Sequence, residues 1–175
     1  MHVSKRKRAL LYSTRSRLSQ VLLAVSDLVA FNLGPLVAGL LVSVLLGNLH
    51  NYIPEDEVGS RLSAHLLLSL TCVAWFWFRL RHYTYRKPFW FELKEVLRTV
   101  LVFAVIDLAI VAFSKWHLSR YIWVFTWTSV LLFLPVFRFL TKRLLQRFNL
   151  WKKQCIIIGA GGNAVDAFHA LRSET

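Results

Sequence analysis

The sequence predicts an all-α membrane protein with four transmembrane helices, followed by the first strand and helix of an incomplete Rossmann-like domain. Three observations support this prediction. Of the 175 residues, 56% are hydrophobic, and the mean hydropathy is +0.48. The apolar residues fall in four blocks that are too long for the core of a soluble domain of this size. A glycine-rich turn near the C-terminal end lies between a β-branched run and a helical pattern.

Four segments are long and apolar enough to cross a bilayer, which takes about 20 residues of helix. They cover about residues 18–47, 62–80, 96–113 and 121–140, and together they define a transmembrane domain over 18–140. A basic arm at 1–17 precedes this domain, a basic connector at 141–153 follows it, and the Rossmann-like start occupies 154–175. The first apolar segment is longer than the roughly 7–15 residues of a signal peptide, so we expect a retained anchor.

Lys and Arg residues are distributed unequally between the two sides of these segments. Six lie in the N-terminal arm, six between the second and third spans, and seven after the fourth, against only Arg61, Lys115 and Arg120 elsewhere. Cytoplasmic loops carry the excess of Lys and Arg, so both termini are predicted to be cytoplasmic. The basic residues follow the membrane edges and form no separate basic domain, which argues against nucleic-acid binding.

Asp27 and Asp107 are the only acidic residues inside the predicted spans. Each lies about nine to eleven residues from the predicted cytoplasmic side, and a helix rises ~1.5 Å per residue, so their depths are similar. One interpretation is a proton or substrate path, because carboxylates inside a membrane are costly. The other is two buried acids, protonated or hydrogen-bonded to Trp, Thr or Ser. We favour the second, because no basic residue is expected at that depth.

The first span contains two further signals. The pair Gly34-Pro35 predicts a kink, because proline removes a backbone donor and crowds the preceding turn. Gly39, Ser43 and Gly47 are spaced four residues apart, which is typical of a small-residue stripe where helices approach closely. We expect this stripe to pack within the bundle rather than form a dimer seam.

Residues 75–90, "WFWFRLRHYTYRKPFW", alternate aromatic and basic side chains at the predicted cytoplasmic edge of the second span. Such a composition is typical of an interfacial anchor, and it could also bind a lipid phosphate. The lipid-phosphate candidates are Arg79, Arg81, Arg86 and Lys87. Residues 89–98, "FWFELKEVLR", are expected to form an amphipathic helix on the membrane surface that leads into the third span.

The segment 159–164, "GAGGNA", fits the G-x-G-x-x-G/A pattern, with a predicted strand at 154–158 before it and a helix from 165 to 172 after it. Gly159, Gly161 and Gly162 are therefore weak candidates for binding a cofactor phosphate, and we interpret them mainly as structural turn residues. The acidic residue expected about 20 positions further on would lie beyond Thr175, and no second strand follows. We therefore expect the chain to be the front part of a longer protein, with no catalytic residue and no metal ligand of its own.

Three stretches carry a resemblance to a known family: 77–99 "WFRLRHYTYRKPFWFELKEVLRT", 119–128 "SRYIWVFTWT" and 151–164 "WKKQCIIIGAGGNA". There the chain resembles the N-terminal region of the polyprenyl-phosphate hexose-1-phosphate transferases. The resemblance implies four membrane helices, a Rossmann-like cytoplasmic domain and a C-terminal catalytic domain with an Asp-Glu pair and magnesium. That domain moves sugar phosphate from a UDP-sugar to undecaprenyl phosphate in O-antigen, capsule or exopolysaccharide synthesis.

No position of this sequence corresponds to the Asp-Glu pair. The resemblance therefore implies a membrane domain in the bacterial inner membrane that is inactive alone and holds no cofactor, with magnesium expected only in the missing catalytic domain. It also implies that membrane lipids, and undecaprenyl phosphate among them, are partners, and we expect a homo-oligomer.

Two alternatives stay open at this point. The chain could be the N-terminal part of a membrane-anchored, NAD-dependent nucleotide-sugar dehydratase or epimerase, in which the glycine turn would bind the dinucleotide. It could also be a free-standing four-helix membrane scaffold or small transporter, supported only by Asp27 and Asp107.

Overall fold

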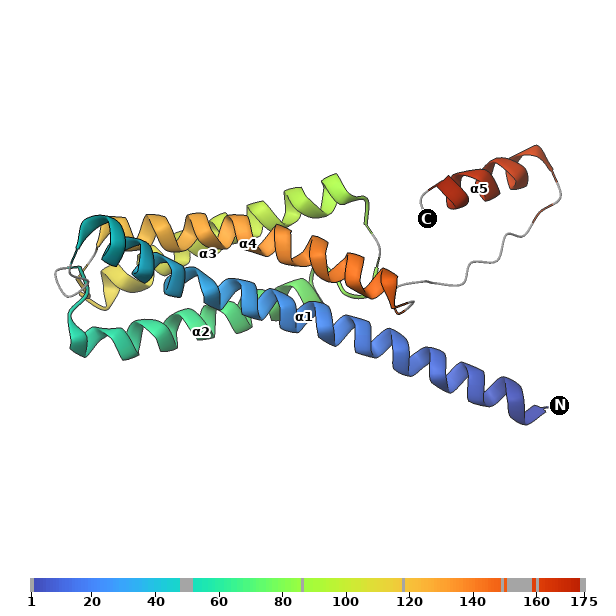
Figure 1. Ribbon diagram of the computed structural model, residues 1–175, viewed down its shortest axis with the longest axis horizontal. Coiled ribbons are helices and arrows are strands. Elements are labelled where there is room, and N and C mark those ends of the chain that lie inside the picture. Colours follow the sequence, from blue (N-terminus) through green and yellow to red (C-terminus); the bar gives the residue numbers. More distant parts are fainter. Residues whose placement is uncertain are drawn as a thin grey trace.

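The structure is a computed structural model that describes residues 2–47, 52–85, 87–117, 119–148, 150, 159 and 161–173, with side chains described between residues 17 and 170. Its helices, in chain order, are α1 (His2–Leu46), α2 (Glu55–Phe78), α3 (Phe89–Phe113), α4 (Arg120–Arg147) and α5 (Gly162–Ser173). Figure 1 shows α1 to α4 lying side by side along the long axis of the molecule, with α1 extending beyond the other three at its N-terminal end.

Four helices are long and apolar enough to cross a membrane, over Arg17–Leu46, Glu55–Phe78, Phe89–Phe113 and Arg120–Arg147. The predicted all-helical, multi-pass membrane domain is thereby confirmed. No strand occurs in the described ranges, and the strand predicted at 154–158 lies outside them. Of the predicted Rossmann-like unit, the structure therefore describes three positions of the glycine turn and the helix, α5.

The helices extend further than the apolar blocks indicated. The arm at 2–17 continues into α1 without a break, and the predicted surface helix at 89–98 is the first part of α3. Pro88 stands directly before α3 with φ −54°, an angle that suits a helix start, and no helix breaker follows it within α3. The helix α4 likewise runs on to Arg147, well into the predicted connector.

Two helices approach closely at Gly34, where α1 packs against α4. A Cβ atom placed on Gly34 would lie 2.5 Å from Val130 Cγ2 and 3.1 Å from the carbonyl oxygen of Thr126. Two members of the predicted small-residue stripe do not pack against another helix among the described residues. Ser43 is exposed and donates to the Gly39 carbonyl, and Gly47 has open space around its Cα.

Pro35 lies inside α1, and the helix continues through it. Proline has no N–H, so the carbonyl of Phe31, four residues earlier, lacks its usual helical donor. His65 of α2 lies 3.2 Å from this carbonyl through Nε2, which must therefore carry the proton. The imidazole thus compensates for the missing backbone bond and joins α2 to α1.

The core and the outer surface have the pattern of a protein surrounded by apolar solvent. Phe31, Phe76 and Val130 are completely buried between the helices. Large apolar side chains also cover the outside, and examples with high exposure are Leu36 (60%), Val44 (73%), Phe78 (78%) and Phe113 (89%). A soluble monomer rarely exposes so much contiguous apolar surface, and the lipid tails of a bilayer would cover it.

The contact at Gly34 yields a prediction about stability. Gly34→Ala should lower the free energy of unfolding by about 1–3 kcal/mol, because the new methyl group must displace Val130 and meets the backbone of Thr126. The measurement is an unfolding titration in mixed micelles. Gly59→Ala is the matched control, because a Cβ at Gly59 in α2 meets nothing within 4 Å. Equal stability of the two variants would contradict the proposed close packing.

Candidate functional site

A buried polar cluster lies between the helices around Arg138 of α4, which is only 4% exposed. Its Nε lies 2.8 Å from Asp27 Oδ1, and its Nη2 lies 2.5 Å from Asp27 Oδ2. Two parallel bonds of this kind form a bidentate pair, the strongest arrangement of guanidinium and carboxylate. The pair joins α1 to α4. We call these two residues, together with the residues linked to them by hydrogen bonds or ion pairs, the Arg138 cluster: His82, Tyr83, Lys87, Glu92, Glu95 and Lys142.

The connection between α2 and α3 folds back to complete the Arg138 cluster. His82 and Tyr83 are 3% and 4% exposed, and the Tyr83 hydroxyl donates to Asp27 Oδ2 at 2.6 Å. The turn that directs them inward contains Arg81 with φ +51°, an uncommon conformation for a residue other than glycine. The guanidinium of Arg138 also lies over the Phe76 ring, with Cζ 4.3 Å from the ring centroid.

Two carboxylates of α3 extend the cluster. Arg138 Nη1 lies 3.2 Å from Glu92 Oε1 and 2.7 Å from His82 Nδ1. Because arginine can only donate, His82 Nδ1 accepts, and its Nε2–H donates to Glu95 Oε2 at 2.7 Å. Lys142 pairs with Glu92, and Lys87 lies 2.5 Å from Glu95. The cluster therefore contains three cations and three carboxylates: Lys87, Arg138 and Lys142, and Asp27, Glu92 and Glu95.

The two loop residues have shifted protonation equilibria. Burial, and next the positive charge of Arg138, lower the pKa of His82 below its usual value. Burial, and next the negative charge of Asp27, raise the pKa of Tyr83 above its usual value. At neutral pH the imidazole is therefore neutral and the phenol protonated, which are the forms that these hydrogen bonds require.

The expectation that no basic residue lies at the depth of Asp27 is wrong. Arg138 is one of the seven basic residues counted after the fourth span, although it lies just inside the end of the predicted segment 121–140. Its long side chain reaches the carboxylate of Asp27. Asp107 has one of the expected partners, because Trp127 Nε1 donates to its Oδ2 at 2.9 Å. The two acids thus belong to different environments, although the sequence presented them as a pair.

The lipid-phosphate candidates that the structure describes also have different environments. Arg79 and Arg81 are exposed, and Arg81 Cζ lies 5.8 Å from the centroid of the Tyr85 ring. Lys87 is part of the Arg138 cluster through Glu95. Arg86 lies outside the described residues. The sequence interpretation missed His82 and Tyr83, because they were treated only as interfacial aromatic residues within a basic stretch.

The glycine turn is described at three positions. Gly159 has φ +149°, which residues with a side chain rarely adopt, so this position requires glycine. A Cβ at Gly161 or Gly162 would meet nothing within 4 Å, and α5 begins at Gly162. Among the described residues, no three His, Cys, Asp or Glu side chains are placed to hold a metal ion.

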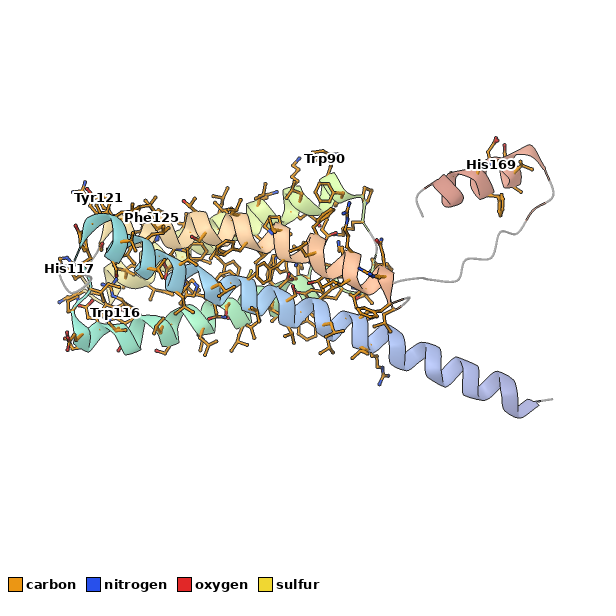
Figure 2. The ribbon with its side chains drawn as sticks, in the orientation of Figure 1. Trp90, Trp116, His117, Tyr121, Phe125 and His169 are labelled. Atoms are coloured by element: carbon orange, nitrogen blue, oxygen red, sulfur yellow. The ribbon has the colours of Figure 1, made fainter. Side chains whose placement is uncertain are left out.

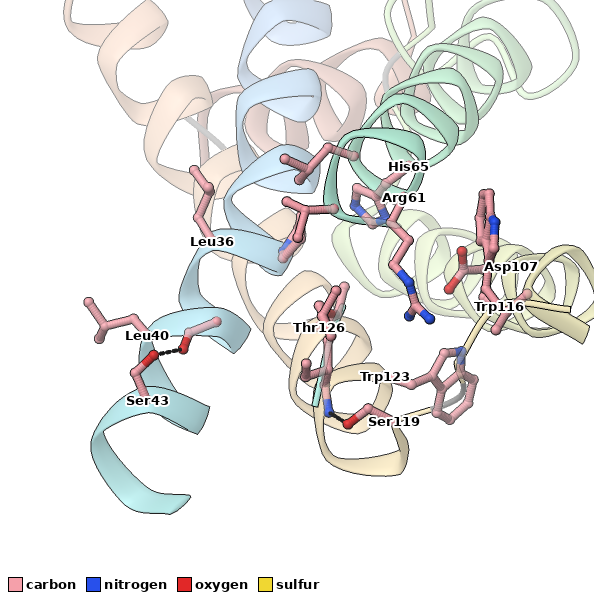
Figure 3. Close-up of a pocket in the computed structure, with 17 residues that line it drawn as sticks. Leu36, Leu40, Ser43, Arg61, His65, Asp107, Trp116, Ser119, Trp123 and Thr126 are labelled. Atoms are coloured by element: carbon pink, nitrogen blue, oxygen red, sulfur yellow. Dashed lines mark hydrogen bonds between the residues drawn. The ribbon is translucent and has the colours of Figure 1, made fainter. Parts of the chain in front are cut away.

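A second polar region surrounds a cavity of about 400 Å³ between the other ends of the helices, which we call the Trp123 cavity (Figure 3). Arg61 of α2 projects toward it and is held by Glu57, with Nη2 2.6 Å from Oε2, and by the carbonyl of His117. Asp107 of α3 and Trp123 of α4 also line the cavity. The Nε1 atom of Trp123 is buried and has no hydrogen-bond partner among the described residues.

Figure 2 shows side chains filling the space between the four long helices over most of their length. The Arg138 cluster connects α1, α3, α4 and the loop after α2 through buried charges. Among the described residues its charges are balanced internally, because each carboxylate faces at least one cation.

Comparison with known proteins shows what this chain is similar to. No family model matches it. It is 51% identical over 158 residues to an undecaprenyl-phosphate galactose phosphotransferase of Salmonella typhimurium, which is 90% of this chain and 33% of that protein. It is 50% identical over 163 residues to a UDP-galactose-lipid carrier transferase of Erwinia amylovora, which is 93% of this chain and 34% of that protein. An uncharacterized sugar transferase of Haemophilus influenzae is 44% identical over 156 residues, 89% of this chain and 33% of that protein.

Removal of the central guanidinium should be strongly destabilising. Arg138→Ala leaves two carboxylates buried beside an empty space, and breaking a buried pair in this way costs about 3–5 kcal/mol. Arg143→Ala is the control, because Arg143 lies on the same helix and is exposed. The measurement is the free energy of unfolding in mixed micelles, repeated with Asp27→Asn and the double variant. Strictly additive effects of Asp27→Asn and Arg138→Ala would contradict a direct pair.

The shifted pKa of His82 predicts a pH dependence. The folded state favours the neutral imidazole, so below the ordinary pKa of about 6.5 the unfolded state binds more protons, and stability falls as the pH falls. Above that pH the contribution is fully present. Between pH 7.5 and 5, the unfolding free energy of the native chain should decline more steeply than that of His82→Gln. Parallel declines would show that His82 does not titrate on unfolding.

The chain is thus homologous over nearly all of its length to sugar-phosphate transferases and spans about a third of their length, the N-terminal third, as a multi-pass membrane region.

Proposed function

We propose that this chain is the membrane-embedded N-terminal part of an initiating transferase, which moves a sugar phosphate from a UDP-sugar to undecaprenyl phosphate in surface polysaccharide synthesis. The observation that carries the proposal is the identity of 51% to an undecaprenyl-phosphate galactose phosphotransferase over 90% of the chain. The second relative, a UDP-galactose-lipid carrier transferase, supports the same donor and acceptor classes. These names favour a transferase over a dehydratase or epimerase.

Within such a transferase the role of these residues is anchoring and assembly. The buried charges of the Arg138 cluster satisfy one another, so the cluster is suited to fixing the bundle. The described acids form no group that fits a metal ion. In this proposal magnesium and the Asp-Glu pair belong to the two thirds of the relatives' length that the chain does not match.

The proposal includes a location and an orientation. The bundle lies in the bacterial inner membrane with both termini on the cytoplasmic side, because most Lys and Arg residues lie on that side of the spans. The exposed Arg79 and Arg81 would then face the phosphates of lipid head groups, among which undecaprenyl phosphate is a candidate. We also propose a homo-oligomer, and a Rossmann-like unit whose glycine turn begins at Gly159.

A chimera tests the proposal. The matching third of the Salmonella relative is replaced by this chain, and the chimera is expressed in cells that lack their own initiating transferase. We expect O-antigen synthesis to return, because the chain anchors the catalytic part on the side where it meets the UDP-sugar. An inactive chimera present in the membrane at the normal level would overturn the proposal.

Two controls accompany this experiment. Membranes that contain only this chain should transfer no sugar phosphate, and transfer by them would show that the role is not limited to anchoring. The chimera with Arg138→Ala should accumulate several-fold less than the chimera with Arg143→Ala, because only the first change disrupts the Arg138 cluster.

A further inference from the structure

The Trp123 cavity has no role in the proposed function, and its polar groups have unused hydrogen-bonding capacity. Its volume of about 400 Å³ is within the usual range of small-molecule sites. The indole N–H of Trp123 is buried without a partner among the described residues, a situation that costs about 1–3 kcal/mol unless an acceptor satisfies it. A ligand with an oxygen at this point would remove that cost.

The other polar atoms around the cavity are both donors and acceptors. Arg61 uses Nε and Nη2 to hold Glu57 and the His117 carbonyl, and Nη1 has no partner among the described residues. Asp107 accepts the Trp127 bond through Oδ2, and within the same ranges Oδ1 has no partner. His65 donates through Nε2, so its Nδ1 remains an acceptor. A hydroxyl group donates and accepts at once, and therefore suits this set.

The charges disfavour an anionic ligand. Arg61, the one cation among the described residues that line the cavity, already forms an ion pair with Glu57, with Nη2 2.6 Å from Oε2. Asp107 adds a carboxylate to the cavity wall. A phosphate or carboxylate would meet this second acid without an uncompensated cation to balance it.

The walls indicate an amphiphilic ligand. In Figure 3, Leu36 and Leu40 of α1 lie on one side of the cavity, and Arg61, Asp107 and Trp123 gather on the other. The two leucines are also 60% and 63% exposed on the outer surface, which lipid would cover. An apolar chain bound along α1 can therefore continue from the cavity into the bilayer, while its polar head faces the indole rings and the charged groups.

We propose that the Trp123 cavity binds the hydroxylated head group of an uncharged amphiphile, such as a lipid-linked sugar, whose chain leaves the bundle beside Leu36 and Leu40. The indole N–H of Trp123 and Arg61 Nη1 donate to the head group, and Asp107 Oδ1 accepts from it. This inference stands apart from the transferase assignment, because it depends only on the geometry of the cavity.

The test uses the whole chain in phospholipid nanodiscs, prepared without sugar-based detergents. The dissociation constant is measured for octyl β-glucoside from the rise in thermal unfolding temperature with ligand concentration. We expect saturable binding that weakens about three- to tenfold in Trp123→Phe, which keeps an aromatic ring and loses the donor. Asp107→Asn, which removes an acceptor and leaves its size, should weaken binding similarly. Trp90→Phe is the matched control, because Trp90 is 78% exposed and does not line the cavity.

Two further ligands distinguish the chemistry and its source. Octyl phosphate has the same chain and an anionic head, and tighter binding of this compound would overturn the proposal. Methyl β-glucoside has the head without the chain, and equal affinity for it would show a site for free saccharides rather than amphiphiles. Equal binding of octyl β-glucoside by the native chain and by both cavity variants would also overturn it.

Discussion

The bidentate pair of Arg138 and Asp27 is the interaction on which the rest of the bundle depends. A guanidinium and a carboxylate taken from water lose several kcal/mol of hydration each, and only close geometry with further hydrogen bonds compensates for this. Here Tyr83 supplies a further bond to Asp27, and Glu92 and His82 accept from Nη1 of Arg138. Helices α1, α3 and α4 and the loop after α2 are therefore fixed relative to one another by a single side chain.

This dependence explains why the connection between α2 and α3 folds into the bundle. His82 stacks on Phe76 with ring centroids 5.2 Å apart and bridges Arg138 to Glu95. If the loop left the bundle, the Arg138 guanidinium would lose an acceptor and Asp27 would lose the Tyr83 hydroxyl. The left-handed backbone at Arg81 is an energetic cost that these buried bonds offset.

The membrane architecture could be predicted because it depends on composition and length alone. Four apolar blocks, each long enough to cross a bilayer that takes about 20 residues of helix, have few alternatives to four spanning helices. The polar contacts could not be predicted in the same way, because they depend on rotation and reach. Asp27 and Arg138 are 111 residues apart, and nothing local indicates that their helices face each other. The packing roles of Gly34 and His65 could not be predicted from the sequence pattern either. Gly34 is needed because Val130 of another helix lies against it, and His65 is needed because it bonds the carbonyl that Pro35 leaves unpaired.

The same long-range contacts set an order for the biogenesis of this protein. When α1 leaves the ribosome, it carries a carboxylate at Asp27 and an unpaired carbonyl at Phe31, and neither of their partners has yet been synthesised. His65 arrives with the second helix, but Arg138 arrives only with the fourth. Until then, placing α1 alone in the lipid core costs free energy, because its polar groups have no partners there. The polar groups of the first helix therefore find all of their partners only after the fourth helix has been synthesised.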